Sequence, residues 1–156
     1  MLSNISSLIL ISSIFITLYI INYLYIYYND EQEESSLMNN FMGTILILFG
    51  SLKLINLKKF SIIFKKYNII SQKLVLYSYL YPFIEIILGV LLLLKYNLNY
   101  VYKIVLILMI ISLISVSLSI YKGDKLRCGC LGSLFHLPLS YVTISENIIM
   151  ILFILK

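Results

Sequence analysis

Charged residues are scarce in this sequence, and their scarcity argues against a soluble globular domain. Only 12% of the 156 residues are charged and 61% are hydrophobic, against roughly 25% and 45–50% in a soluble domain. No folded soluble part is expected to display the basic residues, which give a net charge of +5. We therefore expect them to meet anionic lipid headgroups, and we predict membrane lipid as a partner and no nucleic acid.

Alanine and tryptophan are absent, whereas isoleucine, leucine, tyrosine, asparagine and lysine abound. We interpret this as a coding bias, so a single asparagine or tyrosine carries little information. The first apolar segment, Ile5 to Tyr28, lacks the basic start and small-residue cleavage site of a secretory signal. It is also longer than the roughly 7–15 residues of a signal's apolar core. We predict a retained anchor helix.

Long apolar blocks make up most of the chain. A helical block of about 20 apolar residues matches the thickness of a bilayer, and only helices or closed barrels hide their backbone polar groups in lipid. These blocks lack the alternation of barrel strands, so we predict an all-α, polytopic membrane helical bundle. Residues 1–40 form an anchor helix and an acidic loop, Asn29 to Asn40, and residues 41–156 form the main domain. The predicted spans are Ile5–Tyr28, Phe41–Leu57, Leu74–Leu94, Val101–Ile120 and Tyr141–Leu155.

The positive charges predict an orientation. Lys58 to Lys73 alternates lysine pairs with apolar residues, which is typical of an amphipathic segment lying in the membrane interface. Nine of the twelve lysines and arginines belong to the connections between the second and third spans and between the fourth and fifth, when Lys53 near the end of the second span is counted with the first of these connections. Because basic loops stay on the cytoplasmic side, we expect both connections to face the cytoplasm, with the protein in the inner (cytoplasmic) membrane.

The only two cysteines, Cys128 and Cys130, flank a single glycine. Glycine lets the backbone bend sharply, and such a pair can close a strained disulfide of the labile, catalytic kind. Arg127 beside the pair favours the reactive thiolate. Two alternatives stay open: a soft-metal site for Cu(I) or Zn(II), completed by His136, and no chemistry at all.

Two carboxylates fall inside predicted spans. Glu85 lies one turn after Pro82, and Glu146 lies in the fifth span. A carboxylate in lipid is costly and normally faces the bundle interior with a partner. We predict a functional polar position for Glu85, whereas Glu146 either joins a buried polar cluster or lies hydrated near the membrane surface. Lys53 either pairs with Glu85 or extends to the interface.

Several of these segments together resemble the MauE/DoxX-like family of membrane proteins. Pro82, Glu85 and Gly89 resemble the family's Pro-x-x-Glu-x-x-x-Gly helix, and Cys128 to Gly132 resembles its Cys-x-Cys-Phe-Gly loop, with Leu131 in place of the usual Phe. The other matching segments are Phe49 to Lys53 with Phe60 and Tyr67, Leu137 to Leu139, and Ser145 to Met150.

The resemblance implies a four-helix membrane domain, with Cys128 and Cys130 as the redox pair and Glu85 and Glu146 as the family's intramembrane carboxylates. MauE-type proteins are linked to methylamine utilisation and to disulfide formation in an exported dehydrogenase subunit, and DoxX relatives to quinone-linked sulfur oxidation. We expect a thioredoxin-like or other thiol protein as the partner, and a quinone is a candidate cofactor. The charge pattern, however, puts the cysteines in the cytoplasm, where thiols are kept reduced.

Overall fold

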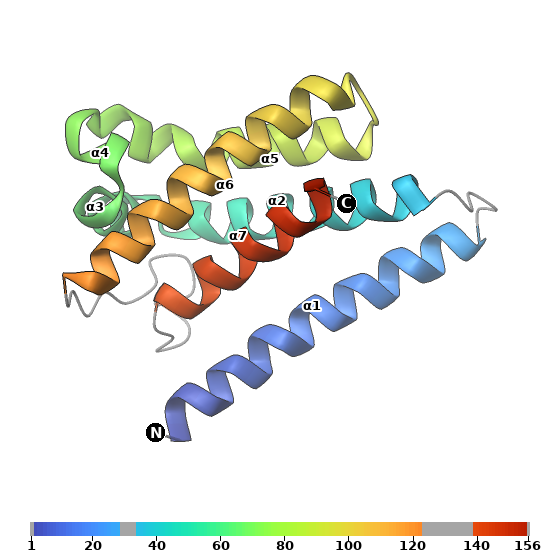
Figure 1. Cartoon of the computed structure of the whole chain (residues 1–156), viewed down its shortest axis with the longest axis horizontal. Helices are drawn as coiled ribbons and strands as arrows, with labels where there is room; N and C mark the ends of the chain where they lie inside the picture. The colour runs from blue at the N-terminus through green and yellow to red at the C-terminus, as the bar shows by residue number, and fades with distance from the viewer. Residues whose placement is uncertain (1, 29–33, 123–138, 156) are drawn as a thin grey trace.

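The structure, a computed structural model, describes residues 2–28, 34–122 and 139–155. The described chain is helical throughout and contains no strand, so the predicted all-α membrane bundle is confirmed. The arrangement of the helices is drawn in Figure 1. The helices are α1 (Leu2–Tyr28), α2 (Glu34–Ile55), α3 (Leu57–Tyr67), α4 (Ile69–Lys73), α5 (Val75–Leu93), α6 (Leu98–Tyr121) and α7 (Leu139–Leu155).

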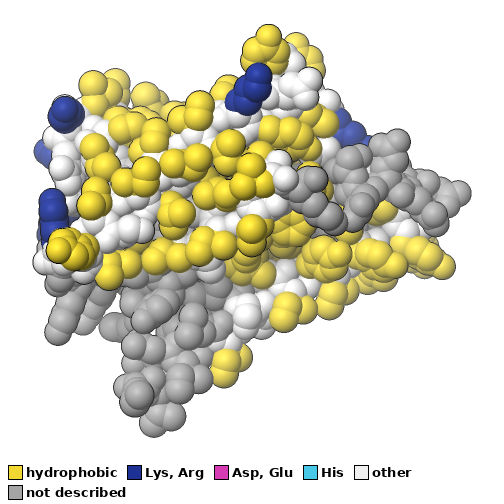
Figure 2. All heavy atoms as spheres, in the orientation of Figure 1, with side chains coloured by type: hydrophobic (Ala, Val, Ile, Leu, Met, Phe, Trp, Pro, Cys, Tyr) yellow, Lys and Arg dark blue, Asp and Glu magenta, His cyan; other side chains and the backbone are white. Residues whose placement is uncertain are grey.

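Three helices are long and apolar enough to cross a membrane, with spans over Ser36–Ile55, Val75–Leu93 and Leu98–Tyr121. They correspond to the second, third and fourth predicted spans. Within the described residues, α1 and α7 contribute shorter apolar stretches, Ser12–Tyr28 and Thr143–Leu155. The face in Figure 2 is largely hydrophobic, and its lysines lie at the edges of this face. So much exposed apolar surface is typical of a protein that faces lipid.

Helices α2 and α5 form the most extensive contact in the bundle and lie side by side (Figure 1). Glycines make this close approach possible. A Cβ atom on Gly89 would lie 2.8 Å from the Gly43 carbonyl oxygen, and one on Gly43 would lie 2.7 Å from the Gly89 carbonyl oxygen. Small residues at a helix contact let two backbones approach within a membrane. The contact aligns the C-terminal half of α2 with the N-terminal half of α5.

The segment Lys58 to Lys73 forms two short helices, α3 and α4, joined at Asn68. The Asn68 side chain accepts hydrogen bonds from the backbone N–H groups of Ile70 and Ser71, which caps the start of α4. The predicted amphipathic pattern is present, with exposed lysines on one face of α3. The apolar face of α3, however, packs on α5 and does not face only lipid. Phe60 and Phe64 are buried in this contact.

The predicted acidic loop, Asn29 to Asn40, is too long, because α2 begins at Glu34. The first turns of α2 contain polar residues that are buried. Because polar stretches usually form loops, their composition did not indicate a helix. Ser36 accepts a hydrogen bond from Lys95 at 2.8 Å, and Asn39 accepts one from Tyr102. These bonds connect the start of α2 to the turn between α5 and α6 and explain why polar residues lie inside the bundle there.

The remaining helices complete the bundle around this pair. Helix α7 packs along α6, and α1 runs antiparallel to α2, where Phe15 lies near Phe49 and Thr44 lies 3.4 Å from the Asn22 side chain. The serines of α6, at positions 112, 115 and 119, are buried. Helices α3 and α4 lie at the end of the bundle where α6 finishes (Figure 1).

Candidate functional site

A buried ion pair joins α2 and α5. Lys53 Nζ lies 2.5 Å and 2.6 Å from the two carboxylate oxygens of Glu85, and both side chains are almost completely shielded from solvent. Tyr81 donates a further hydrogen bond to Glu85. Lys53 therefore pairs with Glu85 and does not extend to the membrane surface. Such a pair is costly to bury unless every charge is bonded, and here the Glu85 carboxylate is fully engaged.

Aromatic rings enclose this ion pair. Lys53 Nζ lies 5.1 Å from the ring centre of Tyr81 and 5.9 Å from that of Phe60, distances typical of cation–π contacts. Phe64 stacks beside Tyr81, with 4.6 Å between ring centres. The α3 helix brings Phe60 and Phe64 to this position, so the short amphipathic helix forms the cover of the ion pair.

A hydrogen bond between serines holds this cover on α5. The hydroxyl oxygens of Ser61 and Ser78 lie 2.5 Å apart, and both side chains are buried. The Ser78 hydroxyl donates to the backbone carbonyl of Val75, which leaves Ser61 as the donor between the two helices. The cover is therefore bound by polar as well as aromatic contacts.

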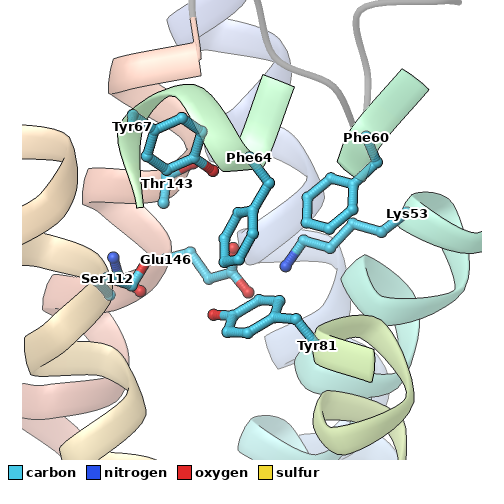
Figure 3. Close-up of a pocket in the computed structure, with 9 residues that line it drawn as sticks. Lys53, Phe60, Phe64, Tyr67, Tyr81, Ser112, Thr143 and Glu146 are labelled. Atoms are coloured by element: carbon cyan, nitrogen blue, oxygen red, sulfur yellow. The ribbon is translucent and has the colours of Figure 1, made fainter. Parts of the chain in front are cut away.

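Glu146 approaches the same place from α7. Figure 3 shows Lys53 and Glu146 pointing toward one space from opposite sides, with the rings of Phe64 and Tyr81 between them. Glu146 is buried, with 3% of its surface exposed, so it joins the polar cluster and does not lie hydrated near the membrane surface. Oxygen Oε1 of Glu146 and the amide nitrogen of Asn147 have no hydrogen-bond partner among the described residues.

These groups line a cavity of about 10 Å³, called the inner cavity below. This is about the space that one water molecule needs. Its lining residues are Lys53, Phe60, Phe64, Tyr67, Tyr81, Ser112, Thr143, Glu146 and Asn147. The cavity is thus walled by aromatic rings on the α3 and α5 side and by polar groups on the α6 and α7 side.

A second cavity, of about 70 Å³, lies nearer the end of the bundle and is called the outer cavity. Its lining residues are Lys66, Tyr67, Ile69, Gln72, Leu118, Ser119 and Lys122. Tyr67 lines both cavities and stands between them. Burial, and then the charge of Glu85, raises the pKa of the Tyr67 hydroxyl well above its ordinary value, so this hydroxyl keeps its proton and can both donate and accept.

The cysteine pair, Cys128 and Cys130, and His136 lie outside the described residues. Chain connectivity still relates them to the site, because the segment that carries them leaves α6 after Lys122 and enters α7 at Leu139. Both points belong to the end of the bundle that holds α3, α4 and the outer cavity. Among the residues that the structure describes, no group of three or more His, Cys, Asp or Glu is placed to hold a metal.

The sequence indicated Lys53, Glu85 and Glu146, and the structure brings them together: Lys53 and Glu146 line the inner cavity, and Glu85 pairs with Lys53. Sequence reasoning did not place the aromatic cover over the ion pair, nor Ser112 of α6 in the lining of the cavity. The signal for the cover was the spacing of Phe60, Phe64 and Tyr67, which places them on one face of α3. No pattern in the sequence indicated that this face turns toward the ion pair.

The fold and the site define a class: a small α-helical membrane bundle with a buried lysine–carboxylate cluster at one end. Within this class the chain belongs to a known family. Residues 33–155 match the model of the family described as Methylamine utilisation protein MauE. The matched region begins just before α2 and ends with α7, so it contains the whole cluster. No curated protein and no solved structure matches the chain.

Proposed function

We propose that this protein is a thiol–disulfide exchange protein of the cytoplasmic (inner) membrane, in which Cys128 and Cys130 exchange electrons with a partner protein. The observation that carries the proposal is the Cys-Gly-Cys pair inside a MauE family domain. The segment bearing the pair follows Lys122 in the sequence, and Lys122 lines the outer cavity. Cations near a thiol favour the thiolate, which is the reactive form.

The exchange transfers two electrons and two protons. When the cysteines are reduced, one of them attacks a partner disulfide as a thiolate, which gives a mixed disulfide and frees one partner thiol. The second cysteine then attacks its neighbour, which forms the Cys128–Cys130 disulfide and releases the second partner thiol. In the opposite direction the same steps place a disulfide in the partner, and the reduced pair then passes two electrons to an acceptor of the quinone or disulfide class.

The partner belongs to the proposal as well. A thioredoxin-like or other thiol protein suits this chemistry, because its own cysteine pair forms the mixed disulfide. The family is described by its link to methylamine utilisation, so a protein of that process is a candidate substrate for disulfide formation. The redox chemistry requires no metal, so the proposal assigns none to Cys128, Cys130 and His136.

Trapping of the mixed disulfide tests this function. In a Cys130→Ser variant, Cys128 can form the mixed disulfide but cannot be released from it, so a covalent complex with the partner should accumulate and disappear on reduction. Cys128→Ser is the matched control, since it separates the attacking from the resolving cysteine. If neither single variant traps a protein and both stay fully active, the redox proposal is wrong.

Metal binding provides a second arm of the test. If the cysteines instead hold a soft metal, Cu(I) or Zn(II) should bind the purified protein in a stoichiometric ratio and be lost in Cys128→Ser. That result, together with an absence of trapped complexes, would replace the redox function by metal handling. An absence of thiol-dependent metal binding removes the metal-handling alternative.

A further inference from the structure

The charges around the inner cavity do not balance. Among the described residues, Lys53 from α2 is the one cation that faces it, whereas Glu85 from α5 and Glu146 from α7 are two carboxyl groups that interact with this lysine. The other titratable side chains here among the described residues are tyrosines, Tyr67 from α3 and Tyr77 and Tyr81 from α5, and a tyrosine is ordinarily neutral at physiological pH. The described part of α6 adds only the hydroxyl of Ser112 to the lining. With both carboxyl groups ionised, the cluster carries a surplus negative charge.

A surplus charge is unfavourable inside an apolar bundle. An isolated buried carboxylate costs far more free energy than a buried neutral group, and neighbouring carboxylates avoid ionising together. The contacts favour Glu85 as the one of the two that keeps its charge. Both oxygens of Glu85 contact Lys53, whereas Oε1 of Glu146 has no partner among the described residues.

We propose that this cluster is a proton-binding site inside the bundle, in which Glu146 holds one exchangeable proton while Lys53 and Glu85 remain an ion pair. The three side chains then sum to zero charge, which is the least costly state in an apolar surrounding. The inner cavity beside Glu146 has room for about one water. Such a water has the unpartnered Glu146 oxygen and the Asn147 amide as hydrogen-bonding partners.

The proton has an entry path at the end of the bundle where α3 and α4 lie. Tyr67 lines the inner cavity on one side and the outer cavity on the other. Its hydroxyl can accept a proton from one side and donate one to the other. The lining of the outer cavity includes the polar side chains of Lys66, Gln72 and Lys122. The inference stands apart from the proposed thiol function, since Glu146 can hold a proton whether or not the cysteines react.

Infrared spectroscopy of the purified protein in lipid tests the proposal, because only a protonated carboxyl group gives the carboxylic-acid C=O band. The native protein should show this band at neutral pH, shifted in D₂O, and Glu146→Gln should abolish it. Glu85→Gln should abolish it too, since Glu146 then ionises to pair with Lys53. The other five acidic residues, Asp30, Glu31, Glu33, Glu34 and Asp124, belong to hydrophilic stretches of the sequence and are expected to be ionised.

Removal of the lysine gives the sharpest result. In Lys53→Met both carboxyl groups lose their counter-ion and should be protonated, so the band should grow about twofold. Lys53→Met/Glu85→Gln should return it to the native intensity. A native protein without the band, or a band that survives Glu146→Gln, overturns the proposal. If Lys53→Met does not fold, the two glutamate variants still decide it.

The entry path has its own matched pair of variants. Tyr67→Phe removes the hydroxyl between the cavities, so the band should shift severalfold more slowly after transfer to D₂O. Tyr102→Phe removes a hydroxyl near the opposite end of the bundle, where Tyr102 contacts Asn39, and should leave the exchange rate unchanged. Equal rates in the two variants would refute entry past Tyr67 but not the bound proton.

Discussion

The charge balance of the buried cluster predicts that Glu85 and Glu146 substitute for one another as the counter-ion of Lys53. The perturbation is a double-mutant cycle that combines Glu85→Gln with Glu146→Gln. Either variant alone leaves one carboxyl group to neutralise the lysine. The double variant leaves Lys53 buried with no anion among its described neighbours, so the two substitutions should not be additive.

The magnitudes follow from the contacts. Glu146→Gln keeps the shape of a protonated carboxyl group, so it should cost about 0–1 kcal/mol. Glu85→Gln breaks two charge-assisted bonds to Lys53 but lets Glu146 ionise, so about 1–2 kcal/mol should be lost. Removal of both anions leaves an unpaired buried charge, which costs about 3–5 kcal/mol. The double variant should therefore lose about 2 kcal/mol more than the sum of the single variants.

Unfolding of the purified protein in detergent, followed by circular dichroism as denaturant is added, measures these losses. A third substitution, Lys53→Met, serves as the control. Added to the double variant, it removes the unpaired cation and should recover most of the lost stability, because a neutral apolar cluster carries no charge to bury. Additive losses in the double variant would refute the shared counter-ion.

Three further predictions concern packing, pH and sidedness. Gly89→Ala should lower the free energy of unfolding by about 1–3 kcal/mol, because the new methyl group would lie 2.8 Å from a carbonyl oxygen of α2; the neighbouring Val90→Ala, 41% exposed, should change it by no more than about 0.5 kcal/mol. The folded protein keeps the Tyr67 proton above its ordinary pKa of 10.0, whereas the unfolded chain releases it, so stability should fall as the pH rises past this value, and less steeply in Tyr67→Phe. An impermeant maleimide should label Cys128 of the Cys130→Ser variant only after the cells are opened, as the basic loops indicate; labelling of intact cells would reverse the orientation.

Much of the fold could be predicted from the sequence, because a membrane leaves few choices for an apolar chain. The spans that became α5 and α6 were placed within a few residues, since uninterrupted apolar runs define them. The start of α2 was missed because its first turns are polar. Polar residues are usually solvated, and only the tertiary partners of Ser36 and Asn39 explain their burial.

The charged residues of the site could be predicted from the sequence, but their arrangement in space could not. A carboxylate or a lysine in an apolar run stands out, because its burial is expensive and requires a partner. The aromatic cover could not be predicted, because the same amphipathic pattern serves a helix on lipid and a helix on protein. The side that α3 contacts depends on the turns at Asn56 and Asn68, whose directions the sequence pattern does not determine.

The measurement that tests the central claim most directly is a redox titration of the Cys128–Cys130 pair in glutathione buffers of stepped potential. Alkylation of free thiols, read by mass, gives the oxidised fraction at each step. The account predicts one transition in which both thiols disappear together, with a tenfold change in the reduced-to-oxidised ratio for about every 30 mV and a midpoint above about −300 mV. Cysteines that stay reduced, or stay oxidised, at every potential would contradict it.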